Sequence, residues 1–319
     1  MKQIVTIFLL IASVTSIYAA NIQKPVAQFI SSGAVTDIVY RDGKLYSATD
    51  ASCVDIFDTK TKKIIQKIKV SQIKDFMGDV IDSKVYSVDV IKDKILILSL
   101  AQKGVRRVHI YENNKLELFI PYTEGLFIAK AKFLDENTVL LGLLSNEIIS
   151  YDLKNRKQNY RISVSQSKFS NFVLNEDKSE VIVADESGDL KIHKTSDATL
   201  IKELSGQNLD NVFQVDTKNG IIATAGQDRR VVIYAPKFNS AYYEHAKFLI
   251  YSVGLSPSGK IVGYASDEDN NVALFNTITK AKLGIYGGNK MTLSNILFIN
   301  EKEFFVASDD KTINLYKIK

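Results

Sequence analysis

A seven-bladed β-propeller, an all-β fold, is the architecture that the sequence predicts, and three observations support this prediction. Seven short segments share a pattern close to apolar-x-apolar-aromatic-polar, and their ring-bearing residues are Phe57, Tyr111, Tyr151, His193, Tyr234, Phe275 and Tyr316. The spacings between these residues are 54, 40, 42, 41, 41 and 41, close to the period of a four-stranded blade. Between them lie short β-rich runs separated by Gly, Asn and Asp turns, which are typical of all-β proteins.

Residues 1–20 are predicted to be a Sec-type signal peptide. Lys2 supplies a small positive region, residues 4–11 form a short apolar stretch, and an Ala pair at 19–20 offers cleavage positions. No twin-arginine pair precedes the apolar stretch, so we expect export of an unfolded chain. Residues 21–319 are then expected to form the propeller. The alternative is an uncleaved N-terminal anchor.

The fifth repeat illustrates how each blade is predicted. Its first three strands are expected at 212–215, 221–225 and 230–234, and a weaker fourth strand is expected near 241–243. The second of these strands is apolar throughout. This pattern is expected where neighbouring blades cover both faces of a strand.

An aspartate recurs in the turn before the third strand of the last three repeats. Asp228, Asp269 and Asp310 each stand six residues before the aromatic residue of their repeat. Asp in such a turn can accept backbone N–H bonds, so we predict that these three carboxylates hold the turns. A ring of carboxylates around a metal ion is the functional alternative.

The repeats resemble those of the WD40 propellers over residues 25–319. The segment 226–235, Gly-Gln-Asp-Arg-Arg-Val-Val-Ile-Tyr-Ala, is similar to the end of a WD40 repeat, with Tyr in place of Trp. The segment 255–262, Leu-Ser-Pro-Ser-Gly-Lys-Ile-Val, resembles the turn between the first and second strands, and Glu244-His245 stands where the family usually has Gly-His. No Trp occurs anywhere, so the indole N–H of the family's buried network is absent from every blade.

The two ends of the chain are predicted to complete the last blade together. The final repeat stops at Lys319, directly after its third strand, and the apolar stretch Val26–Ile30 precedes the first repeat. We expect this stretch to pair with the strand that contains Ile313–Tyr316. Such pairing would close the ring and cover an exposed strand edge.

One connection is longer than closure of the ring requires. The spacing of 54 residues places an insertion near Ser71–Ile81, between the first and second blades. Loops of this kind often carry function. Phe76 and Met77 lie in this insertion and are the candidate partner contacts, because exposed aromatic and Met side chains are good interface anchors. A neutral insertion, with both side chains packed onto the blade rim, is the alternative.

The composition indicates no particular chemistry. The chain has a net charge of +5 without basic runs between aromatic residues, so we expect no nucleic-acid partner. No His-x-x-x-His, Cys-x-x-Cys or Gly-x-Ser-x-Gly motif occurs. We therefore predict no catalytic residues, no cofactor and no metal. Cys53 is the only cysteine and is expected to be buried. No later apolar stretch approaches the length of a membrane span, so we expect no stable insertion into a membrane. The protein is also expected to be a monomer.

Two classes of function remain open. The first is a non-catalytic protein-interaction platform in the Gram-negative periplasm, and the missing catalytic motifs favour it. The second is a propeller enzyme, lactonase-like or sugar-acting, with scattered carboxylates in its central channel. The overall organisation also resembles the NapL-type accessory proteins of periplasmic nitrate reductase. That resemblance implies a role in assembly, maturation or electron delivery, with a component of the nitrate reductase system as partner.

Overall fold

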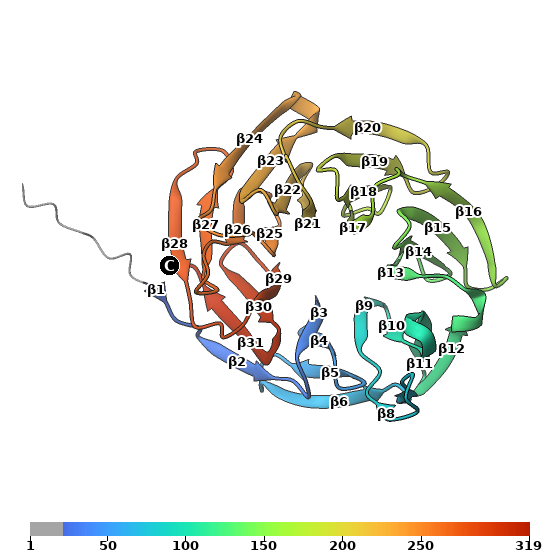
Figure 1. Ribbon diagram of the computed structural model, residues 1–319. Coiled ribbons are helices and arrows are strands. Elements are labelled where there is room, and N and C mark those ends of the chain that lie inside the picture. The colour runs from blue at the N-terminus through green and yellow to red at the C-terminus, as the bar shows by residue number, and fades with distance from the viewer. Residues whose placement is uncertain (1–21) are drawn as a thin grey trace, which may run out of the picture.

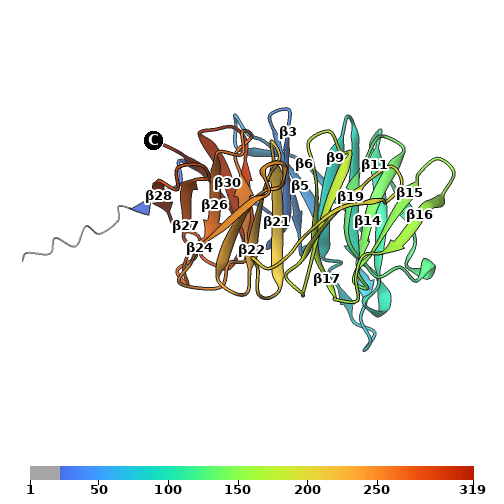
Figure 2. The same cartoon turned by 90° about the horizontal axis from the view of Figure 1, so that it is seen from above.

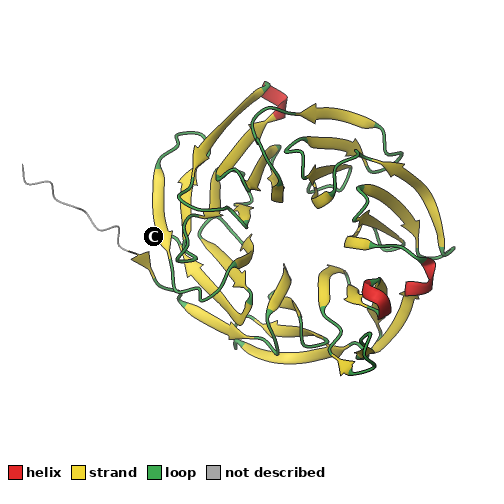
Figure 3. Cartoon of the chain, in the orientation of Figure 1, coloured by secondary structure: helices red, strands yellow, loops and turns green. Residues whose placement is uncertain are grey.

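The computed structural model describes residues 22–319, and the predicted signal peptide at 1–20 lies outside them. Seven small antiparallel sheets stand around a central channel like the blades of a propeller (Figure 1). Helical structure in the described residues is confined to three 3-10 turns, η1 (Gln102–Gly104), η2 (Tyr122–Glu124) and η3 (Pro236–Phe238), as Figure 3 shows. The predicted all-β, seven-bladed fold is confirmed.

Each blade has its first strand at the channel and its fourth strand on the outer rim (Figure 1). Blade one consists of β3 (Val35–Arg41), β4 (Lys44–Thr49), β5 (Cys53–Asp58) and β6 (Lys63–Lys69). Blade two consists of β9 (Val85–Ile91), β10 (Lys94–Leu100), β11 (Arg106–Glu112) and β12 (Lys115–Ile120). Blade three consists of β13 (Ile128–Phe133), β14 (Thr138–Leu143), β15 (Glu147–Asp152) and β16 (Lys157–Ser163). Blades four and five consist of β17 (Phe169–Leu174), β18 (Glu180–Asp185), β19 (Leu190–Lys194) and β20 (Leu200–Leu204); and β21 (Val212–Lys218), β22 (Ile221–Gly226), β23 (Arg230–Ala235) and β24 (Ser240–His245).

The sixth and seventh blades include strands from the N-terminal region. Blade six consists of β25 (Val253–Leu255), β26 (Ile261–Ala265), β27 (Val272–Asn276) and β28 (Lys282–Tyr286), with β1 (Ile22–Gln23) added in parallel to β28. Blade seven consists of β29 (Leu293–Phe298), β30 (Glu303–Ser308), β31 (Asp310–Lys317) and β2 (Ala27–Ile30).

The predicted closure of the ring is confirmed. Strand β2 pairs antiparallel with β31, with Ala27 opposite Leu315 and Phe29 opposite Ile313. Phe29 is fully buried, and its ring meets those of Phe57 and Phe305 edge-on at 5.6 and 5.5 Å between centroids. The N-terminal strand therefore supplies both a row of hydrogen bonds and a core side chain that joins blades seven and one.

The hydrophobic core lies between blades, because each sheet buries both faces against its neighbours. One cluster combines residues of β10 and β11 with residues of β13 and β14, and another combines residues of β4 and β5 with residues of β9 and β10. The repeated ring-bearing residue lies near the end of each third strand and is buried in every blade except the second, where Tyr111 is partly exposed. This explains why the aromatic period is the strongest signal in the sequence.

Tyrosine hydroxyls form buried hydrogen bonds in part of this core. In blade five the Asn208 side chain donates to the Tyr234 hydroxyl at 3.0 Å, and its amide oxygen accepts from Thr224 at 2.7 Å. In blade seven the Tyr316 hydroxyl donates to the Gly287 carbonyl at 3.1 Å. These two blades therefore contain buried hydrogen bonds to a tyrosine hydroxyl.

No helix in residues 22–319 is long and apolar enough to cross a membrane.

Candidate protein-interaction surface

The predicted insertion is a short β-hairpin that projects from one face of the ring. Strands β7 (Ile73–Lys74) and β8 (Val80–Ile81) pair antiparallel and are joined by the turn at 75–79. In Figure 2 this hairpin, coloured blue, extends beyond the ring of blades. Phe76 and Met77 lie at its tip with 95% and 73% of their surfaces exposed. Neither side chain packs onto the blade rim.

The tip of the hairpin has a defined conformation. The carboxylate of Asp75 accepts the backbone N–H groups of Met77 and Asp79, both at 2.9 Å. The backbone N–H of Asp75 also donates to the Asp79 carbonyl at 2.9 Å. Gly78 takes φ = +92°, which favours glycine. The turn therefore holds Phe76 in the solvent.

The base of the hairpin is fastened to both flanking blades. The Asp82 carboxylate accepts from Ser52 at 2.8 Å and from Gln72 at 3.0 Å, and these bonds lower the pKa of Asp82, with the larger effect from Gln72. The Ser52 hydroxyl accepts the backbone N–H of Ser83 at 2.7 Å. The hairpin thus presents its tip from a fixed base.

Further apolar side chains are exposed on the same face. The connections from the outer strand of one blade to the inner strand of the next all lie on one face of the ring, because the inner strands run in the same direction. Exposed residues in these connections, besides the hairpin, are Phe127, Leu209, Phe248 and Met291, with 51%, 64%, 38% and 50% of their surfaces exposed. Single exposed apolar residues are normal on a surface, and these four lie in four separate connections.

The three predicted turn aspartates have different environments. Asp228 accepts the backbone N–H groups of Leu209 at 2.8 Å and Arg230 at 3.0 Å. In blade six, however, the Asp267 carboxylate accepts the backbone N–H groups of Asn271 and Asp269, both at 3.1 Å. Asp269 lies exposed in a longer turn and contributes its backbone N–H, so the turn-holding role predicted for Asp269 belongs to Asp267.

Asp310 is the first residue of β31. Burial opposes its ionisation, but the Thr312 hydroxyl and the Lys311 backbone N–H outweigh burial and lower the pKa of Asp310. Its Oδ2 atom is buried without a hydrogen-bond partner in the described structure. Within residues 22–319, no group of three or more His, Cys, Asp or Glu side chains is arranged to hold a metal ion.

Substitution by Ala distinguishes these turns. We expect Asp228→Ala and Asp267→Ala each to lower the free energy of unfolding by about 1–3 kcal/mol, because each removes two backbone hydrogen bonds. Asp269→Ala, the matched control, should cost less than about 0.5 kcal/mol, as is usual for an exposed side chain. Denaturant unfolding of the three variants measures the differences. Equal losses for Asp267→Ala and Asp269→Ala would contradict the assignment.

The carboxylates along the channel turn sideways onto neighbouring blades. Asp37 of β3 accepts the N–H of Val88 in blade two at 3.0 Å, and Asp89 of β9 accepts the N–H of Phe133 in blade three at 2.7 Å. Asp216 of β21 likewise accepts the N–H of Leu255 in blade six at 2.8 Å. These acids bind adjacent blades to each other.

Two lysines enter the channel from β13 and differ in their partners. Lys132 donates to Asp37 at 3.2 Å and to the Val88 carbonyl at 2.7 Å. Lys130 donates to the Asn171 side chain at 2.8 Å. Burial and the nearby Lys132 lower the pKa of Lys130 to about 8. The channel mouth, a hollow of about 330 Å³, is lined by Lys130 and its neutral partner Asn171, together with Asp37.

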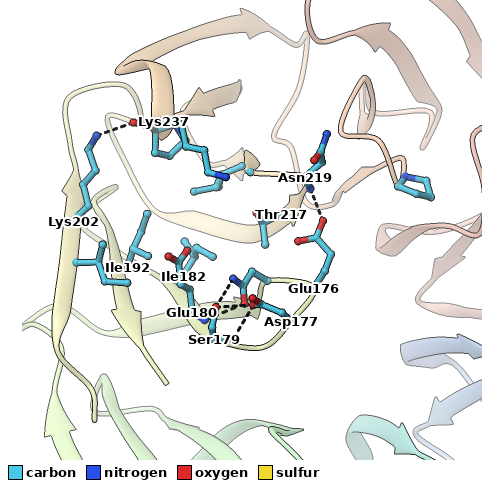
Figure 4. Close-up of a pocket in the computed structure, with 16 residues that line it drawn as sticks. Glu176, Asp177, Ser179, Glu180, Ile182, Ile192, Lys202, Thr217, Asn219 and Lys237 are labelled. Carbon is cyan, nitrogen blue, oxygen red and sulfur yellow. Dashed lines mark hydrogen bonds between the residues drawn. The ribbon is translucent and has the colours of Figure 1, made fainter. Parts of the chain in front are cut away.

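A hollow of about 750 Å³ forms an open groove between blades four and five (Figure 4). Ile182 and Ile192 line its apolar side. Two of its polar side chains are bound within the protein, since Glu176 accepts the N–H of Asn219 and Lys202 donates to the Pro236 carbonyl at 3.0 Å. The groove therefore has a mixed lining, with apolar side chains beside polar and charged ones.

No protein-family model matches the chain, and no curated protein matches it significantly. The structure defines the class of protein, a seven-bladed β-propeller.

Sequence analysis did not single out Arg107, which stands beside the hairpin base. This residue belongs to β11 and donates to the Ser71 carbonyl. It follows Arg106 in a strand whose sequence pattern gives no functional signal. Only the position of the hairpin against blade two shows that Arg107 contacts the hairpin base. Asp75 was also missed, although an Asp three residues before Gly78 is a recognisable turn signal.

Proposed function

We propose that this protein is a non-catalytic protein-interaction platform and that the hairpin tip contacts its partner. The observation that carries the proposal is the exposure of Phe76 and Met77 on a turn with a defined conformation. Because the backbone that carries this pair is already ordered, binding loses little backbone freedom there, so more of the burial of the pair contributes to affinity. Aromatic and Met side chains are enriched at protein interfaces.

We further propose that the platform works in the periplasm of a Gram-negative cell, as an accessory protein of a periplasmic nitrate reductase. The features of residues 1–20 support export, and the overall organisation supports the resemblance to NapL-type proteins. In this role the protein would support assembly, maturation or electron delivery. Its partner would then be a component of the reductase system.

The double variant Phe76→Ala, Met77→Ala tests the platform. Both side chains are exposed, so the melting temperature should change by less than about 2 °C. Partner recovery in a pull-down from periplasm should fall at least about tenfold, because loss of two interface anchors typically costs more than 1.4 kcal/mol.

The matched control is Ile278→Ala. Ile278 has 71% of its surface exposed and follows β27, in a turn on the opposite face of the ring. It should leave recovery unchanged. Undiminished recovery by the double variant would remove the hairpin from the interface, and turnover of a small substrate by the purified protein would favour the enzyme class instead.

A further inference from the structure

A cleft of about 310 Å³ lies between the hairpin and blade two. Ile73 and Val80 line it from the hairpin, and Tyr122 of η2 lines it from the connection that follows blade two. Two cationic residues, Lys74 and Arg107, also line it, and no carboxylate does. The cleft therefore combines apolar walls with a concentration of positive charge.

Arg107 is a partly buried cation without a carboxylate partner. Its Nε donates to Ser99 at 3.3 Å and its Nη2 to Ser83 at 3.4 Å and to the Ser71 carbonyl, all neutral acceptors. Its Nη1 makes no hydrogen bond within residues 22–319. Burial lowers the pKa of Arg107, and no acid offsets this effect. A desolvated charge of this kind is usually paired.

Other cations of the protein show what is missing here. Arg161 forms a paired contact with Glu147 at 2.7 and 2.8 Å, and Lys132 pairs with Asp37. Across the described part of the chain, neither Lys74 nor Arg107 has a carboxylate oxygen within 4.0 Å. The cleft thus leaves two cations available to an external anion.

The acids in and next to the hairpin do not fill this role, and Asp79 forms no ion pair within the described residues. Asp75 is occupied by the backbone of its own turn, and Asp82 is bound by Ser52 and Gln72. Both carboxylates thus accept hydrogen bonds that stabilise the hairpin. The free positive charge of the cleft therefore remains next to the exposed apolar tip.

We propose that this cleft binds an acidic peptide segment of the partner protein, with a Glu or Asp side chain on Arg107 and Lys74. An apolar neighbour of that acid packs against Ile73, Val80 and Tyr122. The Nη1 group of Arg107, which makes no hydrogen bond within the described residues, can donate a charge-assisted hydrogen bond to a carboxylate. This inference rests on the proposed platform function, and it adds the chemistry of the partner.

Selection from phage-displayed random peptides tests the inference with a defined probe. Peptides selected on the wild-type protein should be enriched in Glu or Asp beside an apolar residue. Arg107→Gln should abolish this enrichment, whereas Arg107→Lys should keep part of it, since charge is retained and the planar fork is lost. Lys103→Gln, which removes a charge from the neighbouring η1 turn outside the cleft, is the matched control and should leave the enrichment intact.

The selected peptides then allow a quantitative test. Replacing the acid by Gln in a synthetic peptide should weaken its affinity for the wild-type protein about tenfold, measured by fluorescence anisotropy. The same replacement should have no effect on binding to Arg107→Gln. An unchanged melting temperature shows that this variant folds, and if it does not fold, Lys74→Gln provides the comparison.

Three outcomes would overturn the inference. The first is no acidic enrichment on the wild-type protein, and the second is the same enrichment on Arg107→Gln. The third is Arg107-dependent binding to vesicles of anionic phospholipid, which would assign the site to a lipid headgroup. If partner recovery depends on Phe76 and Met77 while the acid preference is absent, the platform stands and this inference fails.

Discussion

Deletion of residues 21–32 should lower stability sharply, because it removes the strand that closes the ring. Without β2, the edge of β31 loses the partners at Ala27–Ile30 and the core loses Phe29. We expect the truncated protein to melt at a much lower temperature than the full chain, or to aggregate through the exposed edge. Circular dichroism and light scattering during heating measure both effects.

A single substitution separates the contribution of the Phe29 side chain to stability from that of the whole strand. Phe29→Ala should lower the free energy of unfolding by about 3–5 kcal/mol, as a fully buried Phe does when it is truncated. The matched control is Ile30→Ala on the same strand, whose side chain points away from the core and is 48% exposed. That control should cost less than about 1 kcal/mol. An unchanged melting temperature after the deletion would contradict closure by the N-terminal strand.

Removal of either partner of the Asp37–Lys132 pair is the second change that should lower the free energy of unfolding by a large amount. Burial alone would lower the pKa of Lys132, but Asp37 and Asp89 outweigh it and raise the pKa. The pair joins blades one and three through the Val88 backbone of blade two. Lys132→Met should therefore lower the free energy of unfolding by about 3–5 kcal/mol, since Asp37 is left without its counter-charge in a largely buried site.

The double variant and a neighbouring lysine complete this test. Asp37→Leu combined with Lys132→Met should be more stable than the sum of the single losses implies, because no unpaired charge remains. Lys130→Met is the matched control and should cost much less, since Lys130 has only a neutral partner and burial already disfavours its charge. Equal losses for the two lysines would show that the ion pair is not the cause.

Most of the fold could be predicted from the sequence, because one signal recurs in every blade. The ring-bearing residues lie near the ends of the third strands and are buried in six of the seven blades, so their period reports the blade directly. In blade five, the predicted strands at 212–215, 221–225 and 230–234 fall inside β21, β22 and β23. The short strand β1 was missed, since two residues in parallel pairing leave no periodic pattern.

The site was predictable only in part. An excess of residues in one interval locates the hairpin, but the sequence does not decide whether Phe76 is exposed. The turn in blade six shows a similar limit, since one longer loop moves the hydrogen-bonding role from Asp269 to Asp267. The cleft depends on how the insertion lies against blade two. Such packing between distant segments has no local signal.

Site-specific photo-crosslinking from position 76 tests the central claim most directly. A photoreactive phenylalanine analogue in place of Phe76 retains the ring, and the same analogue at Ile278 reports the opposite face. In exporting cells, we predict a discrete crosslinked protein partner from position 76 and none from position 278. The absence of a product from position 76, or the same products from both positions, would contradict a partner site at the hairpin tip.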